Sequence, residues 1–493
     1  MSDAEEAEVA RWFGGFAERA IETACARVFL AGDTAFKVKR HVDLGYVDFT
    51  TAERRTWALE RELAFNKAAA PDIYRALRRI TREADGSLAF DGVGGTVETV
   101  LEMRRFADDA LLAAHPERVD GELAEALGRA IAGFHAAAPV RPLGGASSMA
   151  FTVGSNAQLL GQLAPVLGEP SVARLVALTA AELDRQASLL AARAGQGFAR
   201  RCHGDLHLGN ILVEDGRPIL FDCIEFNDLL SDIDVLYDLA FLLMDLEFRG
   251  RREAAARVLA AWLDQAARSF PATIWEGLAA LPLMLSVRAA VRAHVQAHAG
   301  DPAGARGYLA AAIEHLAPAP PVLAAVGGLS GTGKSSFARA IAPALGASPG
   351  AVVLRTDEIR KRLAGAGPTD RLPRDVYTPA FYARVYETLF AEAGAMLRAG
   401  RAVVLDATFL EPDLRRRAED LAREAGVPFR PAFLDAPQAV LESRIAARVG
   451  DASDATLEVL RGQLERLAHT EVTWPRVDTS GDIPQAAKSW LAT

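Results

Sequence analysis

At 493 residues, the chain is too long for one ordinary hydrophobic core, so two or three domains are expected. Half of the residues are apolar and 24% are charged, a composition typical of a globular protein in water. The net charge of −9 argues against a broad nucleic-acid-binding face. Three cysteines form neither a disulfide framework nor a zinc-binding pattern, which favours a reducing cytoplasm.

The chain shows no membrane-targeting pattern. Its first residues, MSDAEEAEVARWF, begin acidic and lack the basic segment and apolar run of a signal peptide. Charged residues interrupt the most apolar segments, so no stretch of about 18 apolar residues predicts a membrane span. Lysine is scarce, with six in the chain, so a lysine within a motif stands out.

The first 316 residues predict strands followed by helices. A hairpin turns at Gly32-Asp33, and a later segment, CHGDLHLGNILVEDGRPILFDCIEF, predicts a loop, a strand, a turn and a strand. The other expected elements are an N-terminal helix, a helix over 51–69, strands at 76–81, 87–90 and 96–103, helices over most of 104–195, and helices over 251–316.

The sequence APAPP at 317–321 predicts an extended linker, because proline clusters do not continue a helix. After it, strands at 322–326, 352–355, 402–406 and 429–434 alternate with helical patterns, which favours a parallel α/β sheet. We therefore expect an α+β first half, with a small β-rich lobe (1–104) and a helical lobe (105–316). An α/β domain at 322–493 follows.

The stretch HGDLHLGN at 203–210 carries the first set of candidate catalytic residues. Phosphoryl transfer needs a carboxylate beside the acceptor hydroxyl and oxygen ligands for Mg²⁺. Asp205 is the candidate for the base, while Asn210 and the later Asp222 are candidate metal ligands. A polar turn without function is the alternative, but it does not explain the ordered set.

This motif, followed by ILFD, resembles the aminoglycoside and choline phosphotransferase branch of the protein-kinase-like fold. The resemblance implies that Asp205 is catalytic, that Asn210 and Asp222 bind metal, and that Asp238 braces the loop. Residues 1–104 then form the small lobe.

Within that lobe, TAFK resembles the kinase strand whose lysine, here Lys37, contacts the α- and β-phosphates. Lys39 lies on the same face of the strand and is an alternative. The expected partner is Glu62, with Glu60 second. The strand TVETVLEMRRF corresponds to the hinge, with backbone groups of Glu102 and Met103 facing adenine. The chain lacks the G-x-G-x-x-G loop of protein kinases, which favours a small-molecule kinase.

A P-loop forms the second candidate site. Residues 328–335, GLSGTGKS, match G-x-x-x-x-G-K-[ST] between a buried strand and a helical pattern. Lys334 is expected to neutralise the phosphates, and Ser335 to hold Mg²⁺. The residues expected to contact nucleotide are Gly328, Ser330, Gly331, Thr332, Gly333, Lys334, Ser335 and Ser336.

Later residues complete the expected P-loop site. Asp406 ends a strand and is either a metal ligand of the Walker B type or an acceptor contact. Asp357 and Arg360 follow another strand, where P-loop kinases often grip the acceptor. Arg444 and Arg448 are four residues apart and suit a lid over the transferring phosphoryl group, or simply a solvated face.

The second half resembles small P-loop kinases such as gluconate, shikimate and polynucleotide kinases. The whole chain resembles a bacterial fusion of an aminoglycoside-phosphotransferase-like domain with an AAA-type P-loop domain. This resemblance implies a bifunctional cytoplasmic kinase that uses ATP or GTP with Mg²⁺. Its acceptors would be hydroxyl groups. For the first half we expect a sugar, amino sugar or amino alcohol, because acidic residues follow Asp222. Asp228, Asp232 and Asp234 either attract a cationic acceptor or cap helices.

Two alternatives remain for the second half. It could regulate the first half as a nucleotide-sensing module, or it could phosphorylate nucleic-acid ends, against which the acidic balance argues. The sequence does not indicate the oligomeric state.

Overall fold

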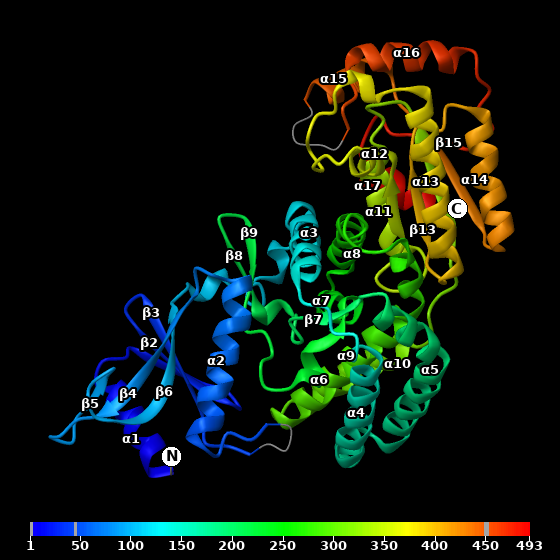
Figure 1. The fold of residues 1–493 in the computed structure, drawn as a ribbon. Helices are drawn as coiled ribbons and strands as arrows, with labels where there is room; N and C mark the ends of the chain where they lie inside the picture. Colours follow the sequence, from blue (N-terminus) through cyan, green and yellow to red (C-terminus); the bar gives the residue numbers. More distant parts are fainter. Residues whose placement is uncertain (1–2, 44–46, 448–452) are drawn as a thin grey trace.

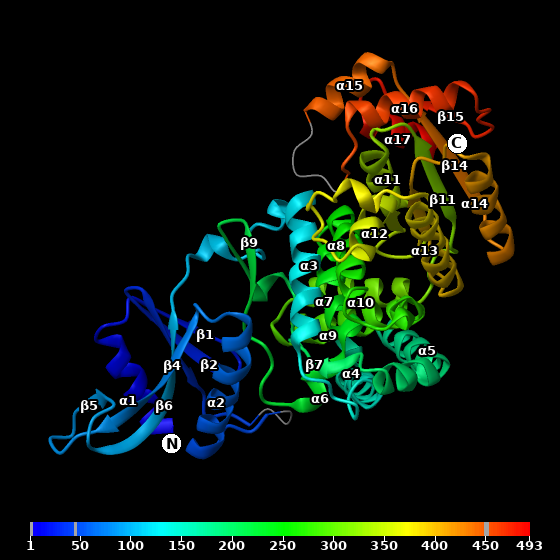
Figure 2. The same ribbon diagram turned by 45° about the horizontal axis from the view of Figure 1, so that its top comes forward.

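The computed structural model describes residues 3–43, 47–447 and 453–493. The chain forms three parts in sequence order (Figure 1): an antiparallel sheet with helix α2 beside it, a group of helices, and a parallel sheet flanked by helices. The helical part lies between the two sheets (Figure 2). The chain therefore has the expected fold class, α+β in its first half and α/β in its second.

The first part is a six-stranded sheet of order β1-β2-β3-β6-β4-β5, in which all neighbouring strands are antiparallel. Phe29 and Phe36 from its strands pack with Phe13 of α1 in a small aromatic core. Its elements are α1 (Asp3–Gly14), β1 (Arg19–Glu22), β2 (Ala26–Ala31), β3 (Thr34–Lys39), α2 (Ala52–Ala69), β4 (Tyr74–Arg82), β5 (Leu88–Phe90) and β6 (Gly95–Arg104).

The middle part surrounds α7, whose residues from Val235 to Leu246 are all buried. A two-stranded hairpin and a second short strand pair lie beside these helices. Its elements are α3 (Gly121–Ala137), α4 (Ala146–Leu167), α5 (Glu169–Gly195), β7 (Ala199–Arg201), β8 (Ile211–Glu214), β9 (Arg217–Leu220), α6 (Asp228–Ser231), β10 (Asp232–Asp234), α7 (Val235–Phe248), α8 (Arg252–Ala266), α9 (Leu281–His298) and α10 (Pro302–His315).

One segment of this part, Ala272–His298, is long and apolar enough to cross a membrane by length and composition alone. In the fold, 78% of its apolar window is buried inside the protein. Its Arg288 donates to the carbonyl oxygens of Tyr237 and Gly204. Packing against the other helices therefore accounts for its apolar residues, as in the core helix of a globular domain.

The third part is a parallel sheet of order β12-β13-β11-β14-β15. Its central strand, β11, is buried along its whole length, which explains its continuous apolar sequence. Its elements are β11 (Leu323–Gly328), α11 (Lys334–Ile341), β12 (Val352–Arg355), α12 (Thr356–Leu363), α13 (Pro379–Arg398), β13 (Val403–Asp406), α14 (Pro412–Ala425), β14 (Phe429–Asp435), α15 (Gln438–Ala446), α16 (Leu457–Ala468), β15 (Arg476–Asp478) and α17 (Ile483–Leu491).

Two details differ from the sequence expectations. Helices do dominate up to residue 195, but the first of them begins only at Gly121, because short 3₁₀ turns containing Pro116 precede it and Asp120 caps it. The short strands β1, β7, β10 and β15 were not predicted, because they are rich in charged residues and three or four residues carry too little periodicity to reveal a strand without an apolar run.

The helical part and the P-loop domain share a packed interface. One hydrophobic cluster continues from the first into the second. Arg362 on α12 contacts Asp264 on α8 at 2.8 Å, and Arg339 on α11 contacts Glu125 on α3 at 2.6 Å. The two halves are therefore held together by more than the segment between α10 and β11.

Glu247, near the end of α7, gives this region a pH dependence. Burial raises the pKa of Glu247 to about 7, although Ser348 and Arg252 favour its charged form. A carboxyl whose folded-state pKa lies above its unfolded value costs stability as pH rises through that interval, here from about 4.5 to 7. Glu247→Gln is therefore expected to stabilise the fold by up to about 3 kcal/mol at pH 8 and little at pH 4.5.

Melting temperatures of wild type and Glu247→Gln, measured at both pH values, test this expectation. A shift of equal size at pH 4.5 and pH 8 would show that the charge on Glu247 is not its cause.

Candidate active sites

The loop from His203 to Asn210 is held from behind by one buried aspartate. Asp238, on α7, accepts hydrogen bonds from the backbone N–H groups of His203 at 3.1 Å and Gly204 at 2.8 Å. Gly204 has a φ of 85°, and a Cβ there would lie 2.8 Å from the carbonyl oxygen of Leu230, so the turn requires glycine. Asp238 thus has the contacts expected of a brace.

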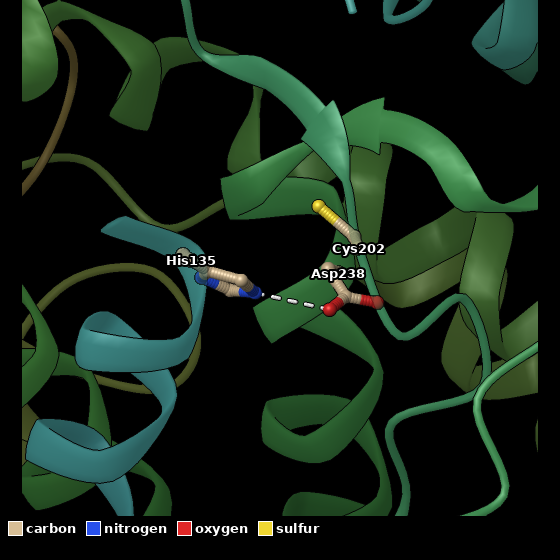
Figure 3. Close-up of side chains that lie close together, drawn as sticks. All are labelled: His135, Cys202 and Asp238. Carbon is tan, nitrogen blue, oxygen red and sulfur yellow. Dashed lines mark hydrogen bonds and ion pairs between the residues drawn. The ribbon is translucent and has the colours of Figure 1, made fainter. Parts of the chain in front are cut away.

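A cluster next to this loop resembles a metal site. The ligand atoms of His135, Cys202 and Asp238 lie within 4.8 Å of one another (Figure 3). However, the indole N–H of Trp262 donates to Nδ1 of His135, so the proton lies on Nε2, which donates to Asp238 at 3.0 Å. Both ring nitrogens are used, and the cluster is better explained as a hydrogen-bonded support for the loop.

Asp205 is presented at the surface of this support, with 38% of its side chain exposed. The side-chain amide of Asn210 donates to the Asp205 carboxylate at 2.9 Å, and His207 lies 3.4 Å from it. Burial tends to raise the pKa of Asp205, but the electrostatic attraction and the hydrogen bond of His207 outweigh it and lower that pKa. Asp205 is therefore a carboxylate at neutral pH and can accept a proton.

Two lysines from β3 converge on one buried glutamate. The Nζ atom of Lys37 lies 2.7 Å from Glu62 and 2.6 Å from Asp222, while Nζ of Lys39 lies 2.7 Å from Glu62 and 2.6 Å from Glu225. The structure thus brings both candidate lysines to Glu62, whereas Glu60 is exposed on α2. Of the two lysines, Lys37 is the one that contacts the candidate metal ligand.

The hairpin β8–β9 returns Asp222 to the same place. Its side chain is 42% exposed and its φ is 63°, an unusual value that the hydrogen bond from its N–H to the Tyr74 hydroxyl helps to hold. Burial tends to raise the pKa of Asp222, but Lys37 outweighs it and lowers that pKa. Asp222 and Asn210 supply the hard oxygen ligands that Mg²⁺ prefers, so this donor set fits the ion.

The expected hinge contacts need correction. Glu102 and Met103 lie inside the sheet, because their backbones pair with β3 on one side and with β4 on the other. Their N–H and C=O groups therefore belong to the sheet and do not face adenine. The backbone N–H of Arg105 still bonds to Asp33, so the connection between the lobes leaves the sheet only after this residue.

The P-loop follows β11 and leads into α11, as expected. Gly328, Gly331 and Gly333 all have positive φ, and a Cβ on Gly331 would lie 2.7 Å from the carbonyl oxygen of Leu441, so the close turn requires glycine. Lys334 begins α11, and its Nζ donates to the carbonyl oxygen of Leu329 at 2.8 Å.

The structure also brings together the two candidate metal ligands of this site. The hydroxyl of Ser335 donates to Asp406 at 2.6 Å, at the carboxyl end of β13. Arg355 lies 3.2 Å from the same carboxylate. A hydroxyl and a carboxylate at a P-loop form a donor set that fits Mg²⁺.

The other P-loop residues have distinct surroundings. The Ser330 N–H donates to Gln463 at 2.8 Å. The Thr332 hydroxyl donates within the loop, to Leu329 at 2.8 Å. Ser336 is exposed and lines an outer groove together with residues of α8 and α17.

The expected acceptor and lid residues fall in three different situations. Asp357 and Arg360 form an ion pair on α12; burial tends to raise the pKa of Asp357, but Arg360 outweighs it and lowers that pKa. Arg444 donates to the carbonyl oxygens of Thr479 at 2.7 Å and Gly481 at 3.3 Å, and so contacts the loop that follows β15. Arg448 lies outside the described residues, and α15 ends at Ala446.

Comparison with known proteins identifies the family. Rv2004c, an uncharacterized protein of Mycobacterium tuberculosis (strain ATCC 25618 / H37Rv), is 33% identical over 488 residues, which are 95% of this chain and 94% of that protein. The chain belongs to the same family. It is a fusion of two kinase-related domains: residues 47–281 match the phosphotransferase enzyme family, and residues 323–470 match an AAA domain.

Solved structures align with each half of this kinase fusion separately. A choline/ethanolamine kinase family protein from Mesorhizobium loti is 14% identical and covers 64% of this chain and 98% of its own, with a TM-score of 0.37. A gluconokinase from Sinorhizobium meliloti 1021 is 26% identical and covers 35% and 90%, with a TM-score of 0.25. The fold class follows from the sheets described above and does not rest on these likenesses.

The acidic residues after Asp222 are neutralised in the kinase fusion. Asp228 contacts Arg61 and Arg201, Asp232 lies 2.7 Å from Arg201, and Asp234 pairs with Arg193 and caps α7. Ion pairs and helix capping therefore explain these three aspartates, and they give no support for a cationic acceptor.

Two contacts in these sites were missed by the sequence analysis. Glu225 holds Lys39 at 2.6 Å, and its position three residues after Asp222 was a signal that could have been weighed. Gln463 reaches the P-loop from α16, and nothing in the sequence near it indicates this contact.

The two lysines of β3 can be separated by substitution. Lys37→Met is expected to lower kcat/KM of the first half about 10²-fold, because Lys37 joins Glu62 to Asp222 and is placed to meet phosphate charge. Lys39→Met removes a contact to Glu225 and is expected mainly to lower the melting temperature. Steady-state kinetics and melting curves of both variants separate the two roles. A loss of kcat/KM in Lys39→Met as large as that in Lys37→Met would contradict the assignment of Lys37 as the phosphate-binding lysine.

Proposed function

We propose that the kinase fusion is bifunctional: each half transfers the γ-phosphoryl group of ATP or GTP to a hydroxyl group. The observation that carries this proposal is that each half places a lysine, expected to bind phosphate, close to its own pair of candidate metal ligands. In the first half Lys37 contacts Asp222 at 2.6 Å. In the second, Lys334 begins the helix on which Ser335 contacts Asp406 at 2.6 Å.

In the first half, Asp205 would accept the proton of the acceptor hydroxyl while Lys37 neutralises the phosphates. Asn210 and Asp222 would hold Mg²⁺, which supplies positive charge to the transferring group. The exposure of Asp205 supports a soluble acceptor that reaches it from solvent. We propose a small hydroxyl compound such as a sugar as that acceptor, and the cytoplasm as the place of reaction. An amino sugar or amino alcohol belongs to the same proposal only through the family resemblance, because the aspartates that could attract a cation are paired with arginines.

In the second half, Lys334 and the N–H groups of the P-loop would bind the phosphates, and Ser335 with Asp406 would hold Mg²⁺. The Asp357–Arg360 pair on α12 supports an acceptor site next to them. For the second half we propose only that the acceptor is a compound with a hydroxyl group.

A second candidate function follows from the packed interface. The P-loop half would bind nucleotide and regulate the first half without a transfer reaction of its own. The ion pairs of Arg362 with Asp264 and of Arg339 with Glu125 favour it, because they connect α12 and the P-loop helix to the helical part.

Phosphorus NMR of ATP or GTP with a pooled metabolite panel separates these functions. Wild type is expected to form two kinds of phosphorylated product, Asp205→Asn only that of the P-loop half, and Lys334→Ala only that of the first half. A single product that Asp205→Asn removes would instead support the regulatory function.

A further inference from the structure

A side chain from a helix distant in the sequence accepts a hydrogen bond from one backbone N–H group of the P-loop. The backbone N–H of Ser330 donates to Oε1 of Gln463 at 2.8 Å. Gln463 lies on α16, which runs along the P-loop domain next to α15 (Figure 1), and only 6% of the residue is exposed. The contact is therefore a buried hydrogen bond between α16 and the loop that is expected to bind phosphate.

This position matters because P-loop N–H groups bind phosphate oxygens. A backbone N–H has one hydrogen and makes one good hydrogen bond at a time. The amide oxygen of Gln463 is an acceptor like a phosphate oxygen, so the two compete for the Ser330 N–H. Two side chains of the loop bond to residues of the loop or of the neighbouring strand: Lys334 donates to Leu329, and Ser335 donates to Asp406.

We propose that Gln463 is an intramolecular competitor of the nucleotide phosphate, and that nucleotide binding exchanges the α16 contact for a phosphate contact. The inference rests on the proposed binding of nucleotide by the P-loop. Breaking a buried hydrogen bond without a replacement is costly, but the phosphate provides the replacement. α16 is then released when nucleotide binds and returns when it leaves.

Two substitutions separate competition from packing. Gln463→Leu keeps most of the side-chain volume and removes the acceptor, whereas Gln463→Glu keeps an acceptor and adds a charge that repels phosphate. The matched control is Gln438→Leu on α15, where Gln438 is exposed and bonds only to Glu442 among the contacts of the described residues. All variants are made in the full chain carrying Lys37→Ala, so that the P-loop site dominates the titration.

Calorimetric titration with ADP and with a non-hydrolysable ATP analogue measures the effect. Gln463→Leu is expected to lower Kd about 2–10-fold, the effect of one net hydrogen bond, and Gln463→Glu to raise it at least about tenfold. Gln438→Leu is expected to leave Kd unchanged. A Kd for Gln463→Leu equal to or above that of wild type would overturn the proposal.

Hydrogen exchange of α16 gives a readout that packing alone does not change. Nucleotide is expected to reduce the protection of α16 in the chain with Gln463 and to leave it unchanged in Gln463→Leu. Increased protection on nucleotide binding would overturn the proposal. Lys334→Ala separates failure of this inference from failure of the proposed function. If Lys334→Ala retains full nucleotide affinity, the P-loop does not bind nucleotide as proposed, and the inference fails with it.

Discussion

Asp205→Asn is expected to lower the turnover of the first half about 10²–10⁴-fold, the usual contribution of a positioned acid–base group. Asparagine keeps the shape of the side chain but cannot accept a proton from the acceptor hydroxyl. Nucleotide affinity should change little, because Lys37 and Asp222 are untouched and the proposed contact of Asp205 is with the acceptor and not with the phosphates. The measurement is product formation at saturating acceptor together with a nucleotide titration of the same variant.

The matched control is Asp215→Asn at the β8–β9 turn. Asp215 is exposed and has a φ of 49°, which asparagine adopts readily, so this variant tests the same chemical change away from the site. A variant Asp205→Asn that turns over at the wild-type rate would remove Asp205 from the mechanism.

Lys334→Ala should have the largest effect on the second half. Hydrogen bonds to charged groups contribute about 1.5–3 kcal/mol, so loss of this lysine is expected to weaken nucleotide binding at the P-loop about 10–100-fold. The fold should persist, because Lys334 is only partly buried and lies outside the hydrophobic clusters of the domain. Titration with nucleotide in the Lys37→Ala background measures this site.

Lys488→Ala is the control, since Lys488 is an exposed lysine of α17 in the same domain. If Lys334→Ala and Lys488→Ala bind nucleotide equally well, the P-loop does not work as its sequence implies.

The structure explains why some features were predictable from the sequence. The loop around Asp205 and the P-loop are continuous segments, so residue type and spacing were enough to predict where they lie. The same holds for Lys37, since the alternation of β3 puts it on the face that meets α2. Glu62 could be chosen over Glu60 only as a preference, and burial on α2 now separates them.

Other features depend on contacts between distant segments. Glu225 meets Lys39 across 186 positions and Gln463 meets Ser330 across 133. The sequence offers only the closeness of Glu225 to Asp222 as a signal for the first contact, and no local pattern encodes the second. The hinge prediction for Glu102 and Met103 was wrong because strand pairing continues through both residues, which only the register with β3 and β4 reveals. The aspartates after Asp222 looked available because the arginines that neutralise them come from other elements.

The interface between the helical part and the P-loop domain connects the surroundings of the two candidate sites. The sequence suggested two domains joined by a proline-rich linker. In the structure, α8 contributes Trp262 to the support of the first site and Asp264 to the contact with α12. The two sites are thus built on elements that touch a common helix.

The central claim is that each half has a working active site of its own. The most direct test is phosphorus NMR of products formed by wild type, Asp205→Asn, Lys334→Ala and the double variant under identical conditions. The account predicts that each single variant loses one product and keeps the other, and that the double variant forms neither. Loss of all products in either single variant would contradict it.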